Sequence, residues 1–222
     1  MSRFIQDYGD VAGEGLQALP PEGSALLEKI QRTPAWLGFY TLLLQEGVQG
    51  AVSGLKEYPS FEKIREGEWW RLFSPILLHG NLLHLLFNML WLIPLGKQLE
   101  QRLPSWRYLL FILIVAAFSN TAQYLMSGPN FLGFSGVLCG MLAFMWVRQK
   151  RAAWEGYRMD RLTFLFMLIF VLGLASLQLL SFFVEKAFAI SLSSNMANMA
   201  HLSGGGMGWW LGRGQFFSWR RR

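Results

Sequence analysis

The sequence predicts an all-α membrane protein built as a bundle of six transmembrane helices. Of its 222 residues, 53% are hydrophobic and only 15% are charged. Charge-free runs, above all 108–147 and 187–212, are too long and too apolar for the loops of a soluble protein. The formal net charge of +6 does not indicate a nucleic-acid partner, because the basic residues fall in the loops between such runs.

Five spans follow from the hydrophobic pattern, and a sixth precedes them. The five run over roughly 80–96, 108–127, 135–147, 162–184 and 195–212. The earlier segment, 34–53, contains Gln45, Glu46 and Gln49. A glutamate in the middle of a membrane is costly, so this first span is predicted to cross the bilayer or to lie at its interface.

Lysine and arginine are concentrated in one set of loops, which predicts that both termini are cytoplasmic. That set holds Arg3, Lys29, Arg32, Lys97, Arg102, Arg107, Arg148, Lys150, Arg151, Arg158, Arg161, Arg213, Arg220, Arg221 and Arg222. The other loops hold Lys56, Lys63, Arg65, Arg71 and Lys186. The expected organisation is a cytoplasmic segment over 1–33, a membrane domain over 34–213 with an outer loop at 54–78 and core spans at 79–213, and a basic cytoplasmic tail over 214–222.

Two polar residues indicate chemistry because each lies within a charge-free run. Ser135 occurs in Gly133-Phe134-Ser135-Gly136, a common setting for a nucleophilic serine, and His201 lies far along the chain. A serine hydroxyl needs a base to take its proton, and histidine is the usual base. No Asp or Glu occurs between Glu100 and Glu155, so a Ser–His dyad without a buried carboxylate is predicted.

Glycines give the helices that carry these residues a way to meet. Two pairs have a four-residue spacing, Gly136 with Gly140 and Gly204 with Gly208. Small residues at this spacing let membrane helices approach closely, and packing of the two pairs would bring Ser135 within reach of His201. At ~1.5 Å per residue, both residues and His84 lie within roughly 10 Å of the outer surface.

His84 and Asn88 are four residues apart and therefore share one helix face. Together with the Ser135 backbone N–H, they are candidates for an oxyanion hole. Each of these residues also has a structural interpretation, as helix packing or as hydrogen bonds between helices. The histidines His79, His84 and His201 lack a Cys or acidic partner at metal-ligand spacing, so no metal site is predicted.

Four motifs, in order, resemble those of rhomboid intramembrane serine proteases. They are Gly67-Glu68-Trp69-Trp70-Arg71-Leu72-Phe73, the His-x4-His-x3-Asn pattern from His79 to Asn88, the Gly-x-Ser-Gly pattern at Gly133 to Gly136, and the Ala-His-x2-Gly-x3-Gly pattern from Ala200 to Gly208. The resemblance covers about 66–213. One position differs, since many members carry a tyrosine four residues after the nucleophile and this chain has Cys139.

The resemblance implies a six-transmembrane helical bundle of the rhomboid type and serine endopeptidase activity. It implies that Ser135 is the nucleophile and His201 the base, and that His84, Asn88 and the Ser135 amide form the oxyanion hole. Substrates would be transmembrane segments of other proteins, cut within the lipid bilayer near its outer face, with no metal or organic cofactor. The six-span form favours a bacterial inner (plasma) membrane.

Two other classes of protein compete with a protease. A catalytically inactive rhomboid-like protein that binds membrane clients is the main alternative, and such proteins typically lack the serine or the histidine. A small transporter would place charges or broken helices at the midplane, and the five spans from residue 80 onward contain no such charge.

Overall fold

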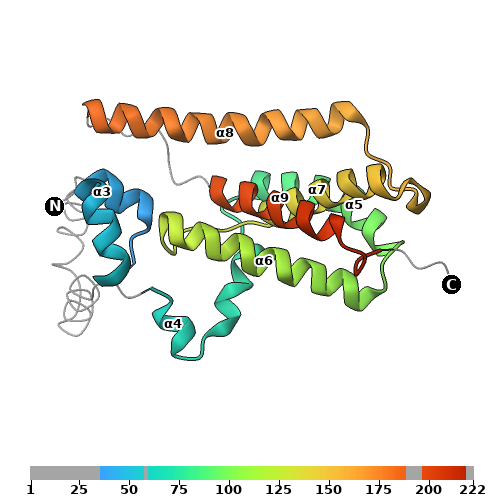
Figure 1. The fold of residues 1–222 in the computed structure, drawn as a ribbon, viewed down its shortest axis with the longest axis horizontal. Coiled ribbons are helices and arrows are strands. Elements are labelled where there is room, and N and C mark those ends of the chain that lie inside the picture. Colours follow the sequence, from blue (N-terminus) through green and yellow to red (C-terminus); the bar gives the residue numbers. More distant parts are fainter. Residues whose placement is uncertain (1–35, 58–59, 189–196, 219–222) are drawn as a thin grey trace. The chain divides into compact units, whose positions relative to one another are not determined.

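The computed structural model describes residues 36–57, 60–188 and 197–218. Within these ranges the chain forms helices and no strand (Figure 1). The predicted cytoplasmic segment, 1–33, and the last residues of the predicted basic tail, 219–222, lie outside the described residues. The chain divides into two compact units after Phe61, and each is described by itself.

The first unit contains α3 (Phe39–Glu57), which falls where the span 34–53 was predicted. Two helical segments meet at a kink at Gly47, whose φ of 73° and ψ of −169° are not helical. A positive φ is open to glycine without a steric penalty, so the bend falls on this residue. By length and composition, α3 is not among the described helices that are suited to cross a membrane.

The second unit contains the remaining helices. They are α4 (Glu62–Arg65), the 3-10 turns η1 (Trp69–Leu72) and η2 (Ser74–Leu77), α5 (Leu82–Glu100), α6 (Ser105–Ser127), α7 (Ser135–Arg151), η3 (Ala153–Glu155), α8 (Arg161–Phe188) and α9 (Asn198–Arg213). The five long helices coincide with the five spans predicted from residue 80 onward. Among the described helices, α5, α6 and α8 are long and apolar enough to cross a membrane. The all-α membrane class is confirmed, whereas the count of six spans stays a prediction.

Most residues of α7 are buried, which places this helix at the centre of the unit. Its 17 residues correspond to about 26 Å of helix, less than the ~30 Å hydrocarbon core of a bilayer. The buried rings of Phe144 in α7 and Phe111 in α6 meet edge to face, with centroids 5.1 Å apart. A short helix is suited to this position because its neighbours, rather than lipid, cover it.

The backbones of α7 and α9 touch along a glycine seam, made of Gly136 and Gly140 in α7 with Gly204 and Gly208 in α9. A Cβ atom added at Gly204 would lie 2.1 Å from the carbonyl oxygen of Gly136. One added at Gly208 would lie 1.9 Å from the carbonyl oxygen of Gly140. Both distances are far below van der Waals contact, so glycine is required at these two α9 positions.

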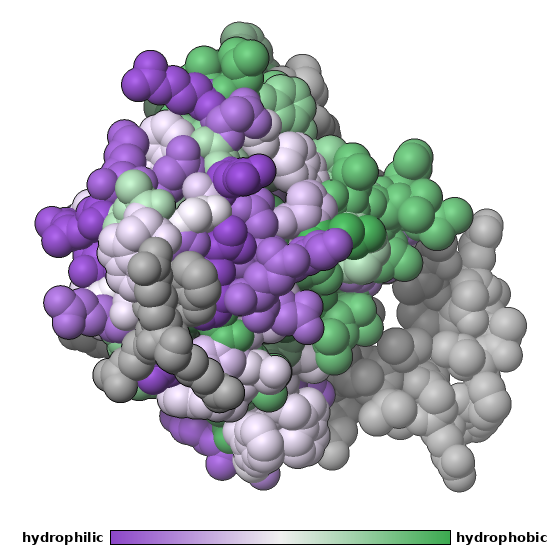
Figure 2. Space-filling view, turned by 90° about the vertical axis from the view of Figure 1, so that its right-hand side faces the viewer, coloured by the Kyte–Doolittle hydropathy of each residue, from purple (hydrophilic) through white to green (hydrophobic). Residues whose placement is uncertain are grey.

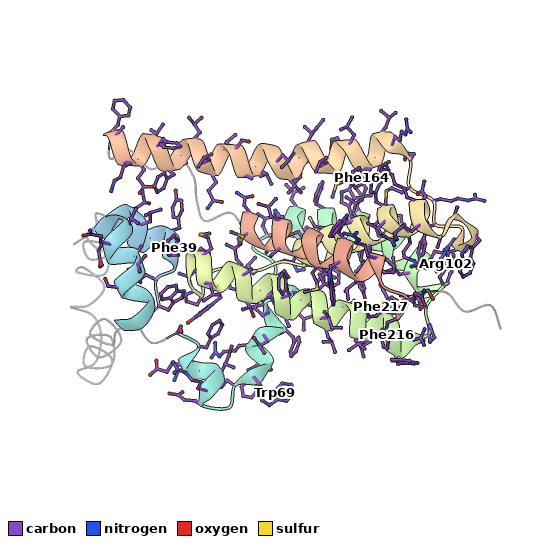
Figure 3. The ribbon with its side chains drawn as sticks, viewed as in Figure 1. Phe39, Trp69, Arg102, Phe164, Phe216 and Phe217 are labelled. Carbon is purple, nitrogen blue, oxygen red and sulfur yellow. The ribbon has the colours of Figure 1, made fainter. Side chains whose placement is uncertain are left out.

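A buried ion pair holds the chain just beyond the C-terminal end of α7. Arg148 donates to both carboxylate oxygens of Glu155, with 2.8 Å for the Nε contact, and to the carbonyl of Gly214 at 3.1 Å. Arg102 donates to the carbonyls of Glu155 (2.8 Å) and Gly156 (2.6 Å), and Figure 3 labels it at this end of the bundle. Because both charges have several partners, the pair is compatible with burial. Together, this pair and the hydrogen bonds of Arg102 join the chain after α5, the end of α7 and the chain after α9.

α8 lies along one side of the second unit and is largely uncovered (Figure 1). Only Met167 and Ser181 of this helix are buried, as expected for a helix that faces lipid on most sides. Phe164 stacks on Trp146 of α7 at 4.0 Å near its start. The helix begins after Asp160, where hydrogen bonds from the hydroxyl and N–H of Thr163 hold the pKa of the carboxyl below its usual range.

Hydrophilic side chains gather at the end of the unit where α7 and α9 finish (Figure 2). The exposed basic residues at the corresponding helix ends are Lys97, Lys150, Arg151, Arg158, Arg161 and Arg213. They belong to the set of loops that was predicted to be cytoplasmic. This end lies opposite Ser135, which begins α7.

Replacement of Gly208 by valine is expected to destabilise the protein by about 1–3 kcal/mol or more, because the new side chain would meet backbone atoms that cannot turn away. Gly206→Val is the matched control, since nothing lies within 4 Å of a Cβ atom at that position. Thermal unfolding in detergent compares the two variants. Equal losses in both would contradict the packing of α7 against α9 described above.

Candidate functional site

Ser135 is the first residue of α7, and its position is fixed by the loop before it. Gly133 has a φ of 119°, a conformation that favours glycine, and its N–H donates to the carbonyl of Pro75 in η2 at 3.0 Å. The chain therefore turns sharply into α7 at Phe134. The first N–H groups of a helix have no partners within it, so the start of α7 offers backbone donors beside the Ser135 hydroxyl.

Ser135 and His201 are brought into direct contact. The Ser135 Oγ and the His201 Nε2 are 2.7 Å apart, within hydrogen-bonding distance. His201 lies in the first turn of α9, and its other ring nitrogen, Nδ1, is buried and has no hydrogen-bond partner among the described residues. The contact is thus a serine–histidine pair, with no carboxylate of the described chain on the far side of the ring.

The glycine seam accounts for this contact. Ser135 immediately precedes Gly136, and His201 lies three residues, or nearly one turn, before Gly204. A Cβ atom at Gly136 would lie 3.1 Å from the carbonyl oxygen of Ala200, the residue before the histidine. The two backbones are therefore already close where the two side chains leave them.

His84 and Asn88 lie on α5 and face the loop that leads to Ser135. A Cβ atom at Gly133 would lie 2.9 Å from the His84 Nε2 and 3.9 Å from the Asn88 Nδ2. Asn81 caps α5, its side-chain oxygen accepting the N–H of His84 at 2.8 Å, and this fixes the first turn of the helix. Polar groups from α5, α7 and α9 thus gather at the same end of the bundle.

Asn88 is fully buried, yet neither its amide oxygen nor its amide nitrogen has a hydrogen-bond partner in the described part of the chain. A buried amide without partners costs about 1–3 kcal/mol, and such groups are rare in folded proteins. The described part of the protein therefore leaves the hydrogen-bonding capacity of this amide unused.

His79, in the loop before α5, lies edge-on to His84 with ring centroids 5.2 Å apart. No group of three or more His, Cys, Asp or Glu side chains suited to a metal ion occurs among the described residues.

Two amide side chains near His201 received no catalytic role from the sequence. Gln123 of α6 accepts the N–H of Ala200 at 2.8 Å, and Asn198 of α9 donates to Gln178 of α8 at 2.7 Å. Both contacts hold the first turn of α9, which carries His201. The sequence does contain a feature that could have indicated them. Both amides lie within apolar runs, and polar groups inside membranes are expensive and often functional.

Cys139 lies one helical turn after Ser135 and is buried. A Cβ atom at Gly205 of α9 would be 3.9 Å from the carbonyl oxygen of Cys139. The helix backbone at this position thus also borders α9.

Comparison with known proteins gives one family. Residues 66–216 match the Rhomboid domain family. The chain is 34% identical over 169 residues to Rhomboid protease GlpG of Yersinia pestis (strain Pestoides F) and, equally, to that of Yersinia pseudotuberculosis serotype O:3 (strain YPIII). The aligned region covers 76% of this chain and 55% of each relative, so the chain spans about half their length. The protein, an integral membrane protein by its family and its apolar helices, belongs to the rhomboid family.

Proposed function

We propose that the protein is an intramembrane serine endopeptidase that cleaves transmembrane segments of other membrane proteins. The observation that carries the proposal is the 2.7 Å contact between the Ser135 Oγ and the His201 Nε2 within a rhomboid domain. The name of the bacterial relatives, Rhomboid protease GlpG, supports the same reaction class.

In the proposed reaction, the Nε2 of His201 accepts the proton of the Ser135 hydroxyl as the Oγ attacks the scissile carbonyl carbon. The tetrahedral intermediate collapses when His201 gives that proton to the leaving amine, which leaves an acyl group on Ser135. Water, deprotonated by the same nitrogen, then attacks the ester carbonyl. The carboxyl product leaves as His201 returns the proton to the Ser135 Oγ. The neutral ring must carry its hydrogen on Nδ1, so that Nε2 is free to accept.

The developing oxyanion requires hydrogen-bond donors, and three are proposed. They are the Asn88 side-chain amide, the His84 ring and the Ser135 backbone N–H. The Asn88 amide has no partner among the described residues, which supports this role, because a preorganised donor is most effective when nothing else uses it. His84 lies next to Asn88 beside Gly133, close to the start of α7.

The proposed substrates enter from the lipid bilayer. The distribution of Lys and Arg supports cytoplasmic termini, which would put the start of α7 near the outer face of a bacterial inner membrane. Cleavage would then occur near the outer end of a substrate's transmembrane segment. The alternative, an inactive rhomboid-like protein that retains membrane clients, is disfavoured by the presence of both members of the Ser–His contact.

A fluorophosphonate probe is expected to label the purified wild-type protein on Ser135, because the probe reacts with serines activated by a neighbouring base. Labelling should be lost in both Ser135→Ala and His201→Ala, while Ser203→Ala, which removes a hydroxyl of α9 instead, should label like the wild type. In-gel fluorescence and mass-spectrometric mapping of the adduct measure this. Undiminished labelling of Ser135→Ala would reject the assigned nucleophile.

Peptidase activity is expected to fall in acid as the pH decreases from about 8 to 3, because only neutral imidazole accepts the serine proton. The measurement is kcat/KM for a reporter substrate across that range. Thermal unfolding of the same samples separates titration of the base from loss of the fold. A flat profile with an intact fold would count against His201 as the base.

Asn88→Leu is expected to lower kcat by about a hundredfold or more while leaving the thermal stability unchanged or raised. The reason is that the variant removes a donor from the reaction but breaks no hydrogen bond within the described part of the resting protein. Asn120→Leu is the opposite case, since the Asn120 amide donates to the Leu72 carbonyl at 2.8 Å. It should lose stability and keep kcat. Unaltered kcat in Asn88→Leu would remove Asn88 from the oxyanion hole.

A further inference from the structure

The first turn of α9 is held by a side chain from a different helix. Gln123 of α6 is only 1% exposed, and its Oε1 accepts the backbone N–H of Ala200 at 2.8 Å. Its Nε2 donates to the hydroxyl of Ser127 at 2.8 Å, and that hydroxyl donates to the Gln123 carbonyl at 3.2 Å. The orientation of the carboxamide is therefore set, with its oxygen toward α9.

The N–H of Ala200 needs such a partner. Ala200 is the third residue of α9, and the first N–H groups of a helix have no acceptor within it. The residue before the helix, Ala197, has no side-chain oxygen to cap it. Ala200 is itself buried, so an unpaired N–H there would cost stability. Gln123, from a neighbouring helix, therefore provides the hydrogen-bond acceptor that a serine or aspartate at the N-cap usually provides.

The glycine seam leaves one degree of freedom that this hydrogen bond removes. Two smooth glycine faces fix how closely α7 and α9 approach, but they offer few side chains to oppose sliding along the helix axis. A directional hydrogen bond to α6, one residue before His201, fixes the position of α9 along its axis. Asn198, in the same turn, donates to Gln178 and to the Leu174 carbonyl of α8, so the turn is also tied on its other side.

We propose that Gln123 is a positioning residue for His201, which holds the imidazole at hydrogen-bonding distance from Ser135 by capping the first turn of α9. The inference rests on the proposed peptidase function. A displacement of about 1 Å at a reacting group commonly lowers a rate by about a hundredfold. A shift of that size would break the 2.7 Å contact, so the register of α9 decides whether the pair is competent.

Three variants separate positioning from general stabilisation. Gln123→Met keeps the length of the side chain and removes the acceptor, whereas Gln123→Glu keeps an oxygen at the same place. Asn120→Leu is the matched control, because Asn120 is a buried amide of the same helix, one turn earlier, that holds Leu72 rather than α9. For each variant kcat, KM and the unfolding temperature are measured with one reporter substrate.

The expected result is a loss of about tenfold or more in kcat for Gln123→Met with KM changed by less than about twofold. Gln123→Glu should recover most of kcat, and Asn120→Leu should keep it despite a comparable fall in unfolding temperature. The proposal is overturned if Gln123→Met retains wild-type kcat, if Gln123→Glu is no better than Gln123→Met, or if Asn120→Leu loses as much kcat.

Hydrogen exchange provides a readout that does not depend on proteolysis. Peptides covering Ala200 should exchange faster in Gln123→Met than in Asn120→Leu when both are compared with wild type, because only the former frees that N–H. Equal exchange would overturn the capping contact even if the protein is a protease. Faster exchange together with wild-type-like cleavage by Ser135→Ala would retain the cap and reject the assigned chemistry instead.

Discussion

Two glycine-lined backbones in contact set the geometry on which the rest of this molecule depends. In a bilayer the lipid tails are as apolar as the protein, so burial of apolar side chains does little to draw helices together. Close packing takes over that role, and at the glycine seam each α9 glycine lies against a carbonyl of α7. Ser135 precedes the first glycine of one face, and His201 lies nearly one turn before the first of the other. The serine–histidine contact is therefore a consequence of how the two helices pack.

The ends of α7 have different tasks. At its C-terminal end, the buried pair of Arg148 and Glu155 and the hydrogen bonds of Arg102 join the neighbouring helices through many partners. At its N-terminal end, by contrast, several polar atoms are unpaired within the described chain, among them the Asn88 amide and the His201 Nδ1. Buried polar atoms without described partners also occur at the first end, such as the Tyr157 Oη, but only at the second do they lie beside the serine–histidine contact. A site for a reacting group requires such atoms close to its nucleophile.

Much of this arrangement was accessible from the sequence. The hydrophobic pattern placed the five long helices of the second unit, and the glycine spacing in 136–140 and 204–208 indicated which pair would pack closely. The predicted helix ends were less accurate, because α5 continues to Glu100 and α7 to Arg151, beyond the predicted limits of 96 and 147. A span predicted from hydropathy ends at the first charged residue, whereas the helix itself continues into the headgroup region as long as its backbone hydrogen bonds are satisfied.

The features that the sequence did not reveal depend on contacts between distant segments. Hydropathy does not report the rotation of α6 about its axis, so the pattern could not show that Gln123 faces Ala200 rather than another helix. The ion pair of Arg148 with Glu155 crosses a turn whose geometry no periodic pattern encodes. The kink of α3 at Gly47 is similar, since an isolated glycine is compatible with a straight helix as well as a bent one.

Cleavage of a panel of single-span reporter proteins, reconstituted with the purified protein in lipid vesicles, tests the proposed chemistry most directly. Wild-type protein and Ser135→Ala are compared side by side, and the products are identified by mass spectrometry. The wild type is expected to cut at least one reporter within or beside its transmembrane segment, and Ser135→Ala to cut none. Cleavage of the same bond at the same rate by both proteins would contradict the assignment of hydrolysis to the Ser135–His201 pair.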